Sequence, residues 1–573
     1  MPVHNKDISD IFEKMANLLE IKGANQYRIR AYRNAAQTVK NLSKNVSDLV
    51  DEDEDLSELP NIGKDLAGKI KKILKKGTFP DLKKLEKKVP PKLDDIMQIS
   101  GLGGKRVKKI YDQLEIKSLE DLRKAAEEGQ VRKIKGFGKK TEKSILEGIE
   151  TIEESGERLK LAVAEKITQD IVSHLKKDKK IKDITIAGSN RRKKETVGDA
   201  DILVTCKKGS GVMDRFTEYE DVGKVLAKGK TKSSVKLESG FQVDLRVLPQ
   251  VSYGAALIYF TGSKAHNIAI RKIAGKKKFK INEYGVFRGD NRVAGKTEKE
   301  VYEKIGLEYI EPELRENRGE IEAAKKGKLP DLIESGDIRG DLHTHTKLTD
   351  GKYTLEEMVD AAKEKDYDYV GITEHSKHVS VAGGLKAKEV EREIKRIDKL
   401  NKKLRKITVL KGIEVDILEN GSLDLPDSLL KELDYTVCAV HYKFGLSKKK
   451  QTDRILKAMD NKYFNILAHP TGRMLKEREP YELDIERIMK GAKKRGCILE
   501  LNSHPERLDL NDVYCKMAKE IGVKIAISTD AHSIDELDYI KYGLGQARRG
   551  WLEKSDVVNT GTLKQLKKAF KRK

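Results

Sequence analysis

The chain has 573 residues, of which 38% are hydrophobic and 37% are charged. This length and polarity indicate a soluble protein of several domains. Lys and Arg outnumber Asp and Glu by 117 to 93, for a formal net charge of +24, which favours a polyanionic partner, nucleic acid rather than membrane. A thermophile-like surface rich in Lys and Glu is the alternative explanation of the charge.

The cysteine pattern excludes two further classes. The four cysteines lie far apart without a CxxC pair, so neither a disulfide framework nor a thiolate zinc site is indicated. No stretch is apolar and long enough to span a bilayer, and the N-terminus is too polar for a secretory signal. We therefore expect a cytoplasmic protein with no membrane partner.

Changes in hydrophobic periodicity divide the chain into six segments. Two helical segments come first, followed by one with alternating strands, a basic helical one and a polar linker. In the last, strands alternate with helices, as in parallel α/β domains. In chain order the segments are residues 1–80, 81–150, 151–250, 251–316, 317–336 and 337–573.

Three turns in the first 150 residues share a hydrophobic–Gly–hydrophobic–Gly core before a predicted helix, with lysine following each. The residues concerned are Gly63 and Lys64, then Gly101, Gly103 and Lys105, then Gly136, Gly138, Lys139 and Lys140. Each turn resembles a helix-hairpin-helix, a module that grips DNA without reading its sequence. Glycine allows a tight turn whose N–H groups meet a phosphate at a helix N-terminus, and lysine adds positive charge.

The first of these turns has Asn61 where the others have their leading glycine. Asn tolerates positive φ better than most residues, so we expect the turn to persist. Three ordinary helix connections capped by glycine are the alternative. A dinucleotide-binding site is not indicated, because no complete GxGxxG follows a strand.

Three carboxylates predict a two-metal site. Asp199 and Asp201 are two residues apart at a strand start and therefore face the same side. Asp244 lies within the apolar strand 242–248, where an unpaired charge is costly. Together they can hold two Mg²⁺ ions, one activating a 3′-hydroxyl and one steadying the leaving pyrophosphate. The alternative is two exposed acids in a surface turn and a third in a salt bridge.

A phosphate-binding turn precedes these acids. Gly188-Ser189 forms a small turn that backbone and hydroxyl groups can present to a phosphate, and Arg192 can neutralise its charge. The turn, the arginine and the three acids resemble the palm of family X DNA polymerases, the group that includes DNA polymerase beta.

The resemblance continues in residues 259–267. It implies that Tyr259, Phe260 and Gly262 belong to the segment that contacts the incoming sugar and that Asn267 contacts its base. Arg271 falls where the family has an arginine that contacts the template strand. Alternatively, residues 259–267 are simply the start of a helix that is preceded by aromatic residues and capped by Gly-Ser.

Residues 31–36 and the first hairpin resemble the small lyase domain of the same family. Lys69 matches the family's Schiff-base lysine, which removes a 5′-deoxyribose phosphate. Asp65, however, stands where the family has a phosphate-binding lysine. A solvated helix face is the alternative role for Lys69.

In the last segment, polar residues cluster at the C-terminal ends of seven predicted strands, the third of them spanning 409–413. Such ends converge on one face of an α/β barrel, and imidazole with carboxylate suits Zn²⁺, Mn²⁺ or Fe²⁺. Any single histidine here could instead be structural. His378 and His504 lie near the cluster but off its spacing, so we expect them to support the ligands or lie at the surface.

This cluster resembles the polymerase and histidinol phosphatase (PHP) domain, a distorted seven-stranded barrel that holds up to three metals. Arg473, close behind one of these histidines, is a candidate phosphate contact or a surface arginine. All nine positions of the implied ligand set are present: His343, His345, Asp350, His375, Glu414, His441, His469, Asp530 and His532.

The order of segments resembles the bacterial and archaeal family X polymerases along nearly the whole chain. It implies helical helix-hairpin-helix domains (1–80 lyase-like, 81–150 fingers), an α+β nucleotidyltransferase palm (151–250) with thumb (251–316), a linker (317–336), and a C-terminal distorted seven-stranded α/β barrel (337–573).

The implied function is gap filling in DNA repair, coupled to a 3′–5′ exonuclease, 3′-end processing or abasic-site endonuclease activity. Its cofactors would be Mg²⁺ or Mn²⁺ at the palm and up to three Zn²⁺, Mn²⁺ or Fe²⁺ ions in the barrel. Gapped or primed DNA and dNTPs are the expected partners of a monomer. Two alternatives give the barrel another role, as a small-molecule phosphatase or as a metal-braced scaffold without turnover.

Overall fold

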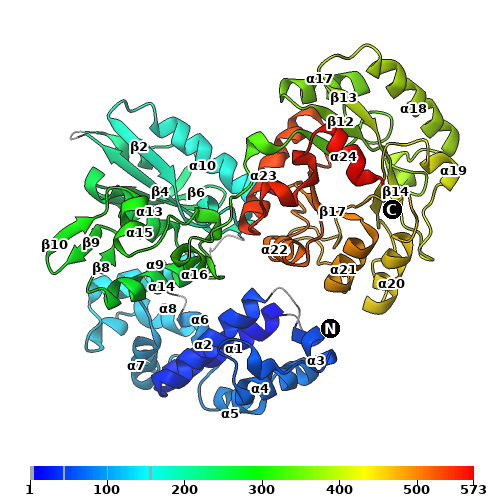
Figure 1. The fold of residues 1–573 in the computed structure, drawn as a ribbon. Helices are drawn as coiled ribbons and strands as arrows, with labels where there is room; N and C mark the ends of the chain where they lie inside the picture. The colour runs from blue at the N-terminus through cyan, green and yellow to red at the C-terminus, as the bar shows by residue number, and fades with distance from the viewer. Residues whose placement is uncertain are drawn as a thin grey trace. The chain divides into compact units, whose positions relative to one another are not determined.

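A computed structural model describes residues 5–42, 46–97, 99, 101–153, 158–207 and 210–572. The chain forms two compact units, Met1–Gly156 and Glu157–Lys573, whose elements Figure 1 labels. None of the helices in the described part of the chain combines the length and the apolar character needed to cross a membrane.

The described residues of the first unit form helices and the turns between them, without strands. Its long amphipathic helices bury one face in a single core, in which the rings of Phe12, Tyr32 and Phe79 lie within 6.2 Å of one another. The predicted segments 1–80 and 81–150 therefore share one core. Its α-helices are α1 (Asn5–Lys22), α2 (Gln26–Asn41), α3 (Val46–Asp51), α4 (Lys64–Lys76), α5 (Pro80–Glu86), α6 (Leu93–Ile96), α7 (Gly104–Leu114), α8 (Leu119–Glu127) and α9 (Lys139–Glu153).

The palm opens the second unit with a five-stranded mixed sheet in the order β2-β4-β7-β6-β5. Its central strands β4 and β7 run parallel, and both neighbours of this pair are antiparallel to it. The palm elements are β1 (Leu159–Lys160), α10 (Leu161–Leu175), β2 (Ile181–Ile186), α11 (Gly188–Arg191), β3 (Thr196–Val197), β4 (Asp199–Cys206), α12 (Val212–Thr217), β5 (Val222–Lys228), β6 (Lys232–Leu237) and β7 (Gln242–Val247).

The thumb follows as helices and a three-stranded antiparallel sheet, β10-β9-β8. Part of the predicted linker 317–336 is folded, because α16 buries Ile321 and Ala324 in the thumb core. The thumb elements are α13 (Tyr253–Thr261), α14 (Lys264–Lys276), β8 (Lys280–Asn282), β9 (Gly285–Arg288), β10 (Asn291–Ala294), α15 (Glu298–Lys304), the 3₁₀ helix η4 (Pro312–Leu314) and α16 (Glu320–Lys325).

The last domain is a barrel of parallel strands in two sheets, β11-β12-β13 and β14-β15-β16-β17-β18. Parallel bridges Thr344–Ala531 and His375–Glu414 join the sheets at both edges. The third predicted strand is broken into β13 and β14, so the barrel is distorted at that point. Its strands are β11 (Gly340–Thr344), β12 (Tyr369–Ile372), β13 (Thr408–Lys411), β14 (Glu414–Asp416), β15 (Val437–Ala439), β16 (Ile466–Leu467), β17 (Ile498–Asn502) and β18 (Ile525–Ser528).

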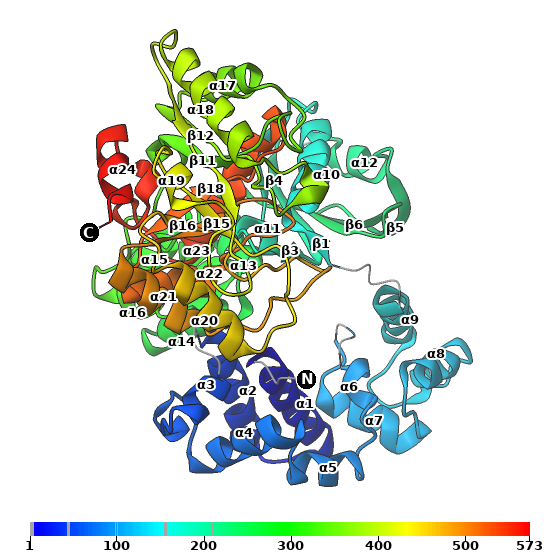
Figure 2. The ribbon, with the colours of Figure 1, turned by 90° about the vertical axis from the view of Figure 1, so that its right-hand side faces the viewer.

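Helices connect these strands, as parallel pairing requires, and both views in Figures 1 and 2 show them around the strands. The strands are buried along their length, and β12 and β18 therefore read as apolar runs rather than alternating ones, whereas β11 buries Asp341 and His343 as well. The helices are α17 (Leu355–Glu364), α18 (Ala387–Asn401), α19 (Asp427–Leu430), α20 (Lys448–Ala458), α21 (Ile485–Arg495), α22 (Asp512–Ile521), α23 (Ile540–Arg549) and α24 (Leu563–Phe570).

Candidate active sites

The three hairpin turns of the first unit have the same backbone geometry. Their leading residues Asn61, Gly101 and Gly136 have φ of 63°, 85° and 95°, so the prediction that Asn61 keeps the turn is confirmed. Ser100, in the second turn, lies outside the described residues. At the closing glycines Gly63, Gly103 and Gly138, the described residues other than the chain neighbours place no heavy atom within 4 Å of where a Cβ would stand. This open space beside a helix N-terminus permits close approach of a phosphate.

Lys69 does not lie on a solvated helix face. Its side chain is buried, with Nζ 2.5 Å from Asp65 Oδ2 and 3.3 Å from Asp81 Oδ2. Burial alone would lower its pKa, but Asp65 and Tyr32 raise the pKa above the ordinary value. A lysine that forms a Schiff base needs a neutral amine, so this environment opposes such a role.

The palm brings the three predicted carboxylates together. Asp201 on β4 and Asp244 on β7 are register partners across the parallel pair, and Asp199 begins β4. Burial, Asp199 and Asp244 raise the pKa of Asp201 to about 7. Burial and Asp244 also raise the pKa of Asp199. This crowding of negative charge favours divalent cations.

Lys232 on the neighbouring strand β6 and Gln242 on β7 contact Asp244. Lys232 Nζ lies 2.8 Å from its Oδ2, and Gln242 donates a 3.0 Å hydrogen bond to its Oδ1. Burial would raise the pKa of Asp244, but these two contacts lower it. Arg246 lies 3.9 Å from Asp201 and 4.3 Å above the ring of Phe260. The palm thus provides positive charge beside its carboxylates.

The predicted phosphate turn begins at α11. Gly188 has φ of 66°, and a Cβ there would stand 3.8 Å from Asp201 Oδ2, which places the turn beside the carboxylates. Arg192 is engaged within the protein. Its Nε donates to Glu316 Oε1 at 3.0 Å, and its Nη1 donates to the carbonyl of Thr261. Arg192 therefore joins the turn to the segment 259–267.

In that segment, the rings of Tyr259 and Phe260 meet edge to face at 5.0 Å, and the Tyr259 side chain is partly exposed. Asn267 is buried and donates a 2.8 Å hydrogen bond from Nδ2 to the carbonyl of Tyr259. Arg271 donates to the carbonyl of Asn267 at 3.1 Å from an exposed position on α14. Gly262 has φ of 70° and approaches Arg192 closely.

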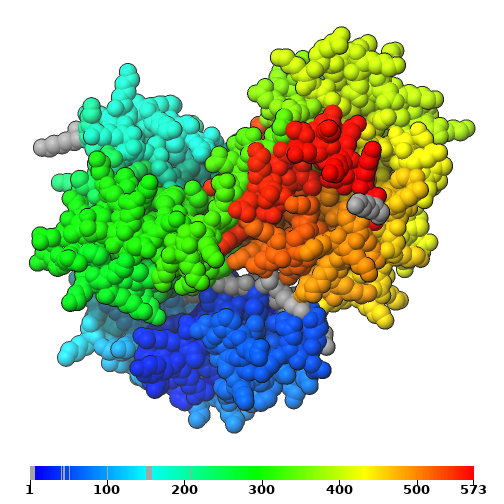
Figure 3. All heavy atoms as spheres, viewed as in Figure 1, coloured from blue at the N-terminus to red at the C-terminus, as the bar shows by residue number. Residues whose placement is uncertain are grey.

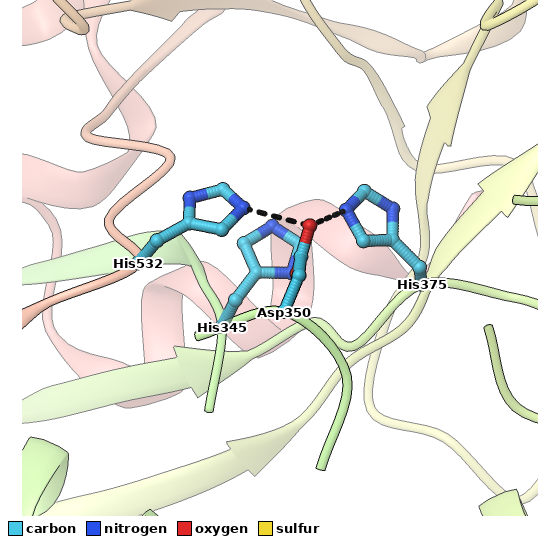
Figure 4. Close-up of side chains that lie close together, drawn as sticks. All are labelled: His345, Asp350, His375 and His532. Carbon is cyan, nitrogen blue, oxygen red and sulfur yellow. Dashed lines mark ion pairs between the residues drawn. The ribbon is translucent and has the colours of Figure 1, made fainter. Parts of the chain in front are cut away.

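In the barrel, eight of the nine predicted ligands fall into three groups whose ligand atoms lie within 4.8 Å of one another. Figure 4 shows one group, with Asp350 between His375 and His532 at 3.3 and 3.4 Å and His345 beside them. The groups are His345, Asp350, His375 and His532; His343, His345 and Asp530; and His375, Glu414 and His441. The ninth residue, His469, has Nε2 3.1 Å from Glu414 Oε1.

Unpartnered nitrogen atoms show that this cluster fits metal. Nε2 of His343 and Nε2 of His345 lie 3.4 and 3.3 Å from Asp530 Oδ1, yet among the described residues neither makes a hydrogen bond. Both atoms are buried. Leaving such atoms without partners is costly, and a shared cation would satisfy both.

The raised pKa values of two histidines also indicate that this cluster is suited to a metal ion. Burial would lower the pKa of His375, but Glu414 and Asp350 raise it to about 10. Burial would also lower the pKa of His441, but Glu414 and Asp416 raise it to about 9. The cluster therefore holds protons in the absence of metal, and a metal must displace them.

Sequence analysis missed the acids that orient the histidines. Glu500 accepts from His343 Nδ1 at 2.7 Å and from the backbone N–H of His469 at 2.7 Å. Asp416 lies 3.3 Å from His441 Nδ1. Such carboxylates fix the ring orientation of metal ligands. Glu500 lies in the largely apolar strand β17, the signal that identified Asp244, whereas Asp416 ends the short strand β14, which also contains Glu414.

Of the other polar residues near the barrel ligands, Arg473 departs from both of the roles considered for it. Arg473 is neither a surface residue nor free to bind phosphate, since its Nη2 lies 2.5 Å from Glu195 of the palm. Arg507, absent from the sequence prediction, lies 3.6 Å from Asp530 Oδ2. His378 is exposed, in agreement with its predicted surface position, and packs against Tyr442, whereas the half-buried His504 packs against Tyr539. Neither belongs to the three ligand groups found among the described residues.

Known families match both units of the chain. A helix-hairpin-helix domain matches residues 3–79 and a SAM-like helix-hairpin-helix tandem matches 93–151. The DNA polymerase beta thumb matches residues 256–316, and the PHP domain matches 341–504. The four matches follow one another in the order that the sequence predicted.

Among similar proteins, the DNA polymerase/3'-5' exonuclease PolX of Bacillus subtilis (strain 168) is 37% identical over 575 residues, covering 100% of both chains. A probable phosphatase of Thermoanaerobacter sp. (strain X514) is 30% identical over 252 residues, 41% of this chain and 96% of its own. The phosphatase thus corresponds to the barrel region, whereas PolX spans every domain. This chain belongs to the family X DNA polymerases that carry a C-terminal PHP domain.

Proposed function

We propose that this protein is a DNA-directed DNA polymerase that fills short gaps during DNA repair, and that its barrel trims or cleans DNA 3′ ends as a metal-dependent phosphoesterase. The observation that carries the proposal is the presence of two separate metal-competent clusters in one chain. The full-length similarity to PolX of Bacillus subtilis, named as a polymerase and 3'-5' exonuclease, supports both halves.

At the palm, Asp199, Asp201 and Asp244 would hold two Mg²⁺ or Mn²⁺ ions. When bound, these ions activate a 3′-hydroxyl and neutralise the triphosphate. Gly188 and Ser189 would bind the triphosphate through the backbone and the hydroxyl group. The partly exposed Tyr259 and Phe260 would position the sugar, as family membership implies.

In the barrel, the nine ligands would hold up to three Zn²⁺, Mn²⁺ or Fe²⁺ ions. Such ions, when bound, activate water and neutralise phosphate charge during hydrolysis. Arg507 takes the phosphate-contacting role that Arg473 cannot, because it lies beside Asp530 and keeps part of its surface exposed. Glu500 would hold His343 in position throughout.

DNA is the favoured substrate of the barrel because three hairpins with the geometry of DNA-binding turns precede it in the same chain. Similarity of the barrel to probable phosphatases supports a small-molecule substrate as the second candidate. Hydrolysis of histidinol phosphate is the simplest test for a small-molecule phosphatase activity of the barrel.

One assay tests these proposals together. A duplex with a short gap and a normal, mismatched or phosphate-blocked 3′ end is incubated with dNTPs and Mg²⁺ or Mn²⁺. We expect extension of the normal end, and removal of the mismatch or phosphate before extension. Hydrolysis of histidinol phosphate without processing of any DNA end would exclude the DNA-directed role of the barrel.

A further inference from the structure

Helix α23 belongs to the barrel, yet its C-terminal half reaches the palm. Figure 1 shows α23 between the palm sheet and the barrel strands, and Figure 3 shows the surface of the orange and red C-terminal segment continuous with that of the green thumb. The element packs against α22 and β18 on one side and against η4 on the other. Leu508 and Tyr542 of the barrel domain also join the apolar core of the palm.

Two side chains of α23 bind main-chain carbonyls of the turn formed by residues 188–195. Arg549 Nη1 donates to the carbonyl of Arg192 at 2.7 Å, and Gln546 Nε2 donates to that of Lys193 at 2.8 Å. These carbonyls follow α11, where helical carbonyls lack partners within the helix. The barrel domain therefore completes the hydrogen bonding of the palm's phosphate turn.

Backbone hydrogen bonds within the same turn hold Gly188 and Ser189 in place. The N–H of Lys194 donates to the carbonyl of Ser189 at 3.1 Å, and the N–H of Arg192 donates to that of Gly188 at 3.4 Å. A displacement of Arg192 or Lys193 would consequently move the Gly188-Ser189 segment. Backbone groups that bind phosphate require accurate placement.

A chain of buried charges extends the connection. Arg549 Nη1 also donates to Glu316 at 3.0 Å, and Glu316 in turn accepts from Arg192. Arg549 Nη2 donates to Asp512 on α22 at 2.7 Å, which anchors the guanidinium in the barrel domain. The Arg549 side chain is 2% exposed. A planar guanidinium with fixed donors sets the relative positions of the groups it joins more strictly than an ammonium does.

We propose that Arg549 is a positioning residue for nucleotide addition, through which the barrel domain holds the 188–195 turn in the geometry that binds the incoming triphosphate. The proposal rests on the proposed polymerase function. It makes the barrel domain a structural part of the nucleotide site, independent of the hydrolysis that the barrel carries out.

The test compares substitutions of adjacent residues in the full-length chain. Arg549→Met removes the contact with the turn. Arg548→Met is the matched control, because Arg548 joins the same helix to Glu313 and to the carbonyl of Ile333 and does not touch the turn. KM for the dNTP and kcat are measured on a duplex with a one-nucleotide gap, and hydrolysis by the barrel reports on folding.

We expect Arg549→Met to raise KM for the dNTP by about tenfold, the effect of losing a charge-assisted hydrogen bond, with kcat changed by less than about twofold. Arg548→Met should leave KM unchanged. General loss of structure would instead lower the active fraction, and with it kcat, at constant KM. An unchanged KM in Arg549→Met, or an equal rise in Arg548→Met, overturns the proposal.

Removing Arg549 leaves buried Glu316 and Asp512 without a partner and could prevent folding. If Arg549→Met does not fold, Gln546→Met is tested in its place, because it changes no charge. We expect it to raise KM for the dNTP by about threefold. An unchanged KM in the folded Gln546→Met variant overturns the proposal. If the unaltered protein adds no nucleotide at all, it is the polymerase function that fails.

Discussion

The palm cluster is made of three carboxylates, and the Asp201 side chain keeps 24% of its surface exposed. Basic side chains stand beside these carboxylates. In the barrel cluster, histidines outnumber acids and Glu414 is 1% exposed. Carboxylate oxygens suit weakly held Mg²⁺, which keeps part of its water, whereas buried imidazole suits tightly held transition metals. We therefore expect palm metals to exchange with each nucleotide and barrel metals to stay bound.

The largest expected effect is a separation of the two activities. Asp199→Ala or Asp244→Ala should lower nucleotide addition by at least about 10³-fold, because cation binding supplies several kcal/mol of transition-state stabilisation. Hydrolysis by the barrel should survive. His343→Ala should have the opposite effect, and primer extension with parallel 3′-end hydrolysis measures both. Loss of both activities in either variant would exclude two independent sites.

The second largest effect should be a difference between the palm and the barrel in the metal that restores activity. After dialysis against a chelator, added Mg²⁺ alone should restore nucleotide addition, because carboxylates bind it without histidine. Hydrolysis should return only with Mn²⁺, Zn²⁺ or Fe²⁺. Metal analysis of the untreated protein should find transition metal bound to the barrel. Recovery of both activities with Mg²⁺ alone would remove the distinction between resident and exchanging metals.

Substitution of an orienting acid should have a smaller effect. Glu500→Gln weakens the carboxylate that holds His343, and we expect metal affinity of the barrel to fall by about 10- to 100-fold. Glu393→Gln is the control, since Glu393 is a buried carboxylate that contacts Arg396 rather than a ligand. Titration with Mn²⁺ measures both variants. Equal affinities for the two would show that Glu500 does not support the site.

The smallest effect is a difference in pH dependence. At pH 7 the metal-free barrel holds protons, because the pKa of His375 is about 10 and that of His441 about 9. Metal binding must release these protons, so affinity for Mn²⁺ should rise as pH increases from 6 to 8. At the palm, Asp201 with a pKa of about 7 should limit binding only below about pH 7. Calorimetry in buffers of different ionisation enthalpy counts the protons, and zero release would contradict the barrel prediction.

Much of both sites was predictable because their residues follow local rules. Asp199 and Asp201 share a face since strand side chains alternate, and Asp244 is conspicuous as an acid in an apolar strand. The barrel ligands occur at strand ends, which a parallel barrel brings to one face. Asn61 kept its turn because its side chain tolerates the φ that glycine takes in the other two.

Burial and long-range pairing were not predictable. Glu500 belongs to the barrel site only because its strand places it beside His343, 157 residues earlier. Within the predicted linker, α16 packs two apolar residues into the thumb core, a burial that the charged residues around them did not signal. A solvated helix face was the alternative role for Lys69, and only the fold shows the two aspartates beside its amine.

The sequence by itself determined the order of the matched domains, the hairpin turns, and the acids and histidines predicted as ligands in the palm and the barrel, because each depends on residue type and on spacing within one or two elements. Tertiary structure alone decided what the arginines do. Arg473 pairs with Glu195 across 278 residues and Arg549 with Arg192 across 357. No local pattern encodes such contacts, since an arginine's partner depends on which surfaces the folded domains bring together.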